Sequence, residues 1–133
     1  MSTFTDTIQS TANQNIQKKS ELDTTAHEYW QQSQETLEKI STIVHEVFQE
    51  FAGADPRIKL FMPHSTHLTG ALALINHHIF VIHYLALGQH AQILSMKDPQ
   101  MTPNEVYSQD FDQNSIVQKV QDALSTWFET AIQ

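Results

Sequence analysis

Hydrophobic positions in the first half of the chain recur at three- and four-residue steps, the spacing of one face of an α-helix. Before them, "TAHE" (25–28) has the form of a capping box, and "SELD" (20–23) offers a weaker start. After them, Gly53 and Pro56 can end a helix. We therefore expect a long amphipathic helix from about residue 25, preceded by a polar arm, residues 1–20, that is helical or frayed. Its apolar stripe consists of Trp30, Leu37, Ile40, Val44, Val47 and Phe51.

The pattern changes after Arg57, where runs of β-branched and aromatic residues are separated by turn residues. Such runs are typical of strands. We expect four antiparallel strands, at about 57–62, 67–75, 78–87 and 90–97.

Two dipeptides suit hairpin loops between these strands. They are 76–77 and 88–89, which begin with Asn and Gly, the residues that accept positive φ most readily. Two-residue loops fix the register, so Ile75 should pair with His78, Leu87 with His90, and His83 with both Gly70 and Leu94.

The chain ends in a second amphipathic pattern. Asp112 or Asn114 can cap this helix, and it should pack beside the first one. Between the strands and this helix, "MTPNEVYSQDF" (101–111) is ambiguous, and we favour a fifth, edge strand. The expected fold is α+β and two-layered: residues 21–133 form one domain with a four- to five-stranded antiparallel meander and a helix at each end. The apolar positions of the last helix are Ile116, Val120, Ala123, Leu124, Trp127, Phe128 and Ala131.

Alternation along strands sorts the sheet into two faces, both apolar. We assign to the core the face with Leu68, Leu72, Leu74, Ile79, Val81, His83, Leu85, Leu87, Leu94 and Met96. Two helices can cover only one face, so we expect the other to bind a partner unless the N-terminal arm covers it. The predicted partner-binding residues are Ala71, Ala73, Ile75, His78, Phe80, Ile82, Tyr84 and Ile93.

Composition narrows the function classes. The 133 residues include 7 Lys and Arg, 15 Asp and Glu, and no cysteine. Without cysteine, disulfides, thiolate zinc sites and cysteine nucleophiles are excluded. A net charge of −8 argues against nucleic acid and would favour a basic protein partner. Because the start lacks the pattern of a secretory signal, we expect a cytoplasmic location.

The run from Leu60 to Met96 has six histidines but no Asp, Glu, Lys or Arg. The histidines interrupt it too often for a membrane span. His67, His78 and His77 fall on different parts of the sheet, so we expect no metal or other cofactor. On the face assigned to the core, His83 should be buried and neutral, and its protonation could act as a pH-sensitive latch.

Catalytic motifs are scarce: the sequence contains no Gly-rich phosphate loop, no "GxSxG" and no "HExxH". We therefore expect a small acidic non-enzymatic protein-binding module, of the inhibitor, immunity-protein or secretion-chaperone type, acting as a homodimer. One alternative is a small-molecule or metal-binding domain that uses His67, His78 and Tyr84. Another is a hydrolase-type enzyme with a histidine base, for instance His64 with Ser65 and an acid from 98–112.

Overall fold

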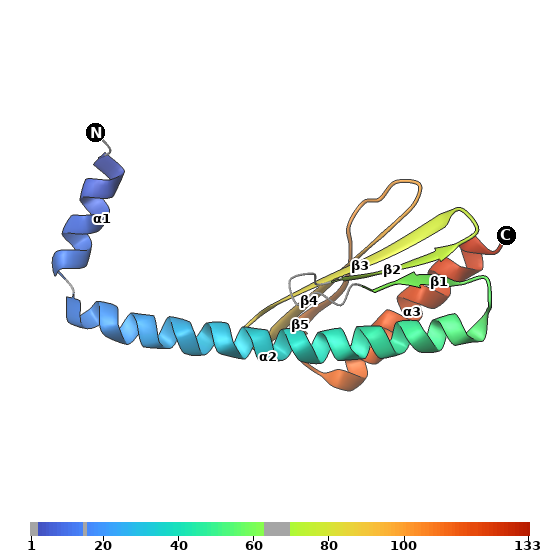
Figure 1. Cartoon of the computed structure of the whole chain (residues 1–133), viewed down its shortest axis with the longest axis horizontal. Helices are drawn as coiled ribbons and strands as arrows, with labels where there is room; N and C mark the ends of the chain where they lie inside the picture. Colours follow the sequence, from blue (N-terminus) through green and yellow to red (C-terminus); the bar gives the residue numbers. More distant parts are fainter. Residues whose placement is uncertain (1–2, 15, 63–69) are drawn as a thin grey trace.

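The structure is a computed structural model that describes residues 3–14, 16–62 and 70–133 (Figure 1). It has a long helix near the N-terminus, one antiparallel sheet and a C-terminal helix, which confirms the predicted α+β architecture. The elements in chain order are α1 (Thr3–Gln14), α2 (Ile16–Ala54), β1 (Lys59–Phe61), β2 (Gly70–Ile75), β3 (His78–Leu87), β4 (His90–Lys97), β5 (Asn104–Asp110) and α3 (Gln113–Ala131).

Helix α2 is longer than the sequence predicted. It begins at Ile16, so the capping box at 25–28 lies inside the helix, and Gly53 lies in its last turn rather than after it. Figure 1 shows the N-terminal part of α2 projecting beyond the sheet. Trp30 is exposed, so its assignment to the buried stripe was wrong. The stripe that is buried consists of Ile40, Ile43, Val44, Val47 and Phe48.

The five strands form a meander in the order β1-β2-β3-β4-β5. The predicted register is confirmed, including the pairs of His83 with Gly70 and with Leu94. Both hairpin loops begin with a left-handed residue, Asn76 at φ 56 and Gly88 at φ 61. A side chain at Gly70 would collide with the strand beside it, because a Cβ there would lie 2.6 Å from the carbonyl oxygen of Ile82.

The C-terminal region also follows the prediction. Strand β5 forms the predicted edge, and its register with β4 shifts between Ile93 and Leu94. Asp112 is the N-cap residue of α3, and its carboxylate accepts a hydrogen bond from Ser115 at 2.5 Å. Helix α3 packs beside α2, where the ring of Phe51 lies 6.2 Å from Trp127 and 5.7 Å from Phe128.

The helices cover the face of the sheet that we predicted to be open. The rings of Phe48 on α2 and Trp127 on α3 both pack against Phe80, with centroids 6.3 and 5.5 Å apart. The alanines of this face leave room for the large side chains of the helices, so the layers fill the space between them. The prediction that this face is uncovered is therefore wrong. Seven of its eight proposed partner-binding residues are buried, namely Ala71, Ala73, Ile75, Phe80, Ile82, Tyr84 and Ile93.

Candidate binding surface

The opposite face of the sheet carries the residues that the sequence analysis placed in the core. Its alternating positions are partly or fully exposed, while their neighbours along each strand are buried. In the register of β1 with β2, Phe61 lies on this face beside Leu72. We call this surface the open face. Its apolar residues are Phe61, Leu72, Leu74, Ile79, Val81, Leu85, Leu87, Leu94 and Met96, and its polar residues on β3 and β4 are His83, His90 and Gln92.

The open face is apolar at its centre and charged only near its two edges. Leu85 and Leu87 on β3 are 44% and 56% exposed. On the edge strands the register places Lys59 opposite Leu74 and Glu105 opposite Leu94. Among the described residues of β2 and β3, none on this face is Asp, Glu, Lys or Arg. A surface of this kind is unfavourable in water and is typical of a protein-binding site.

One signal in the sequence distinguishes the two faces. In the predicted register, His83, His90 and Gln92 all fall on the open face, beside its leucines. Polar side chains in the middle of a strand are rarely buried without partners, so they mark the face that meets solvent. The leucines of the open face favour the opposite assignment, because large aliphatic side chains are typical of a core.

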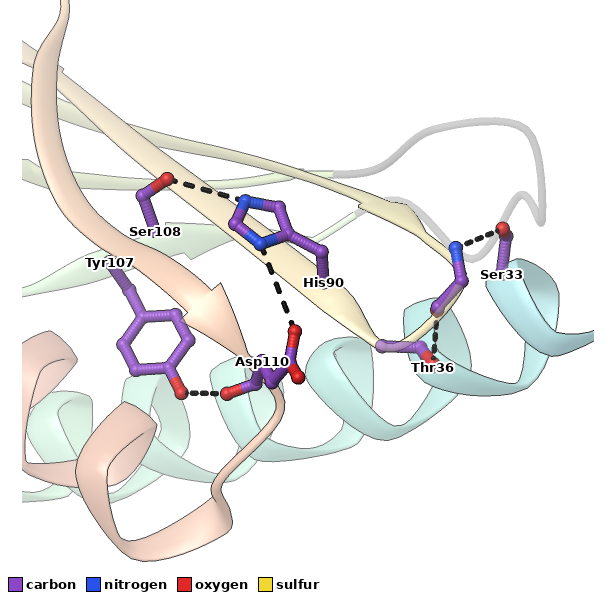
Figure 2. Close-up of polar contacts among 7 residues, drawn as sticks. Ser33, Thr36, His90, Tyr107, Ser108 and Asp110 are labelled. Atoms are coloured by element: carbon purple, nitrogen blue, oxygen red, sulfur yellow. Dashed lines mark hydrogen bonds and ion pairs between the residues drawn. The ribbon is translucent and has the colours of Figure 1, made fainter. Parts of the chain in front are cut away.

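The β3–β4 hairpin is held at the edge of the open face by helix α2 (Figure 2). The backbone N–H of Gly88 donates to the hydroxyl of Ser33 at 2.6 Å, and the hydroxyl of Thr36 donates to the carbonyl of Gly88 at 2.8 Å. All three residues are buried. Since both backbone groups of Gly88 are satisfied by the helix, the hairpin and the adjoining Leu87 have a fixed position.

Figure 2 also shows a serine, a histidine and an aspartate together on β4 and β5. The hydroxyl of Ser108 lies 3.4 Å from Nε2 of His90, and Nδ1 of His90 lies 4.0 Å from Oδ1 of Asp110. The order of groups is that of a Ser-His-Asp triad, but both separations exceed the 2.6–3.2 Å typical of a nucleophile and its base. Asp110 is 80% exposed, so water competes for its carboxylate. At these separations the three groups are further apart than in an activated triad.

His78 belongs to a polar contact at the opposite end of β3. Its Nδ1 lies 3.0 Å from Oδ2 of Asp98, whose Oδ1 accepts the backbone N–H of Ile79 at 2.7 Å. These contacts lower the pKa of Asp98, mainly through the hydrogen bond from Ile79. His78 is partly exposed at the rim of the sheet, so its role in the structure is to join the start of β3 to the end of β4.

The other candidate residues lie apart from one another. His83 is exposed on the open face, so the prediction that it is buried in the core was wrong. Tyr84 lies on the covered face, where its hydroxyl donates to Ser41 at 3.0 Å and burial raises its pKa. His64, Ser65 and His67 lie outside the described residues. Within the described part of the chain, no three His, Asp or Glu side chains are grouped as metal ligands.

Comparison with known proteins gave no further guide to the site. No protein-family model, curated protein or solved structure matched the chain. Among the helices described, none combines the length and the apolar content needed to span a membrane.

Proposed function

We propose that this protein is a non-enzymatic protein-binding module whose binding surface is the open face, and that in solution this face binds a second copy of the chain. The proposal rests mainly on the fact that the helices cover only one of the two faces of the sheet. Helices α2 and α3 both pack on the covered face, while the equally apolar open face retains exposed leucines. Burying such a surface gains about 25 cal/mol per Å² of apolar area.

The composition and charge of the open face support a protein ligand rather than a small molecule. Two hollows on the described surface lie elsewhere: one along α2 between Thr25 and Glu35, the other at the turn between Lys97 and Asn104. A small-molecule site is usually a concave pocket with a few converging polar groups. A sheet face lined by leucine, isoleucine and valine suits the side chains of another protein.

A second copy is the favoured partner because the chain itself has another unpaired apolar surface. Helix α1 carries two exposed large hydrophobic residues, Phe4 and Ile8. Each copy of the chain has a net charge of −8. Two copies can therefore associate only through surfaces that are uncharged where they meet. The centre of the open face meets that condition.

Sedimentation velocity over a range of concentrations tests the proposal. We expect the wild-type protein to be a dimer and the Leu85→Glu variant to be a monomer with unchanged circular dichroism, because the buried charge would have no partner. Thr126→Glu, on the exposed side of α3, is the matched control and should remain a dimer. A monomeric wild type at all concentrations, or a Leu85→Glu variant that dimerises normally, would overturn the proposal.

A further inference from the structure

We propose that the element seated on the open face is helix α1 of a second copy, so that two chains exchange their N-terminal helices. This inference rests on the proposed function and names the contact through which the copies associate. It joins two exposed surfaces of the same chain: the open face, and a stripe on α1 formed by Phe4, Thr7 and Ile8 and continued by Thr11.

The stripe is more apolar than its sequence suggests. Phe4 is 75% exposed and Ile8 is 53% exposed, and Thr7 and Thr11 lie beside them at helical spacing. The hydroxyl of Thr7 donates to the carbonyl of Thr3 at 2.8 Å, and that of Thr11 donates to the carbonyl of Thr7 at 2.9 Å. Because these donors are already bonded within the helix, the threonines can meet an apolar partner without losing a hydrogen bond to water.

The charges of α1 match those of the open face. In Thr3–Gln14, Asp6 is the only charged residue. At about 100° per residue, Asp6 lies roughly 200° around the helix from Phe4, on the side away from the stripe. A helix seated on the open face by its stripe would therefore place its one carboxylate in solvent, and no charge would be buried on either side of the contact.

The length of α2 keeps α1 away from the open face of its own chain. Ser33, which anchors the β3–β4 hairpin, lies 17 residues after Ile16, or about 26 Å along the helix at ~1.5 Å per residue. Ile8 is only eight residues before Ile16. Even with α1 folded back along α2, the six helical steps from Ile8 to the end of α1 and two fully extended links would carry Ile8 about 16 Å, roughly 10 Å short of Ser33.

Helix α2 also lies on the covered face, so a folded-back α1 would approach the wrong side of the sheet (Figure 1). In Figure 1, α1 stands at the far end of α2, separated from the strands by the projecting part of that helix. A second copy placed across this projection can receive α1 on its open face and return its own. Such a reciprocal exchange is a closed, two-fold arrangement with two identical contacts.

Complementation between two variants tests this exchange. The Ile8→Glu variant has a damaged helix and an intact face, and the Leu85→Glu variant has the reverse. We expect each alone to dissociate at least tenfold more readily than wild type, and an equimolar mixture to form a heterodimer through the one intact pair. Gln9→Glu, off the stripe on the same helix, should behave as wild type.

The outcomes separate the two proposals. If Leu85→Glu is monomeric while Ile8→Glu dimerises within twofold of wild type, the open face is a binding surface but α1 is not its ligand. If both variants are monomeric and their mixture stays monomeric, the exchange is also wrong. If the wild type itself is monomeric, both proposals fail.

Cross-linking gives an independent readout, since the chain has no cysteine. A size-tagged Ile8→Cys chain is mixed with an untagged Leu85→Cys chain and treated with a short bismaleimide. We expect the yield of the mixed species to be at least fivefold higher than for Asp6→Cys with Leu85→Cys, because Asp6 lies on the far side of α1. Equal yields would overturn the exchange.

Discussion

Strand β3 has residues on both faces of the sheet, and the residues of the two faces differ in how far they are buried. Phe80 is buried between Phe48 and Trp127, whereas Leu85, on the opposite face, is 44% exposed. Both are large and apolar, so hydrophobicity alone does not tell them apart. What differs is the layer above them, because α2 and α3 pack on one face only. The covered face forms the core of the chain, and the open face is the one that we propose binds a partner.

Truncation on β3 should give the largest contrast between the faces. We expect Phe80→Ala to lower the free energy of unfolding by about 3–5 kcal/mol, because it leaves a cavity among the aromatic rings. Leu85→Ala should cost less than about 1 kcal/mol, since Leu85 keeps much of its solvent contact in the folded chain.

Urea unfolding at a concentration where both variants are monomeric measures this contrast. Equal losses for Phe80→Ala and Leu85→Ala would mean that the open face is covered in the monomer, and the division between the faces would fail. The same division changes what Ala73→Glu should do. If the face with Ala73 were the contact between copies, this variant would be a monomer, but at a buried position beneath the helices we expect it to prevent folding.

Much of this fold could be predicted because strand registers follow from short-range rules. The loops at Asn76 and Gly88 set the pairing of β2, β3 and β4, and every predicted pair is observed. Which face of that sheet is covered depends on where two helices dock, and that is a long-range property. Ala71 and Ala73 are among the predicted partner-binding residues, yet they leave room for the helices of the same chain.

The start of α2 shows a second limit of local reasoning. A capping box at 25–28 is a valid start signal, but helical propensity continues upstream of it, and α2 begins at Ile16. Nothing near Trp30 in the sequence indicates that its side chain is exposed to solvent. The open face and the exposure of Trp30 could not be predicted for the same reason. Both depend on where the helices pack against the sheet.

Replacing Gly88 or Gly53 with alanine should change the free energy of unfolding in opposite directions. Gly88 has φ +61, and a Cβ there would lie 2.9 Å from the ring of Tyr29, so we expect Gly88→Ala to destabilise the protein by about 1–2 kcal/mol. Gly53 has nothing within 4 Å of an added Cβ and lies in a helix. Gly53→Ala should therefore stabilise by about 0.5–1 kcal/mol.

Thermal unfolding of both glycine variants beside wild type measures this effect. A Gly88→Ala variant as stable as wild type would show that the hairpin is not held against α2 in the way that Ser33 and Thr36 suggest. The contact between α2 and the sheet would then begin closer to the C-terminus of α2 than the hydrogen bonds to Gly88 indicate.

The smallest expected effect is electrostatic and lies at the rim between the two faces, where Asp98 bonds Ile79 and His78. The pKa of Asp98 is lowered from its ordinary value of 3.8, so folding favours the carboxylate. Its contribution is complete above that value and is lost as the pH falls through the folded-state pKa. We expect Asp98→Asn to cost about 0.2–1 kcal/mol near pH 7, the range for partly exposed ion pairs, and the difference from wild type to shrink below about pH 4. The loss caused by Phe80→Ala should stay constant over the same range, because no charge is involved. Melting temperatures of wild type and both variants, measured from pH 3 to 7, test this difference. If Asp98→Asn is as much less stable than wild type at pH 3 as at pH 7, the Asp98 carboxylate is not the group that stabilises the rim.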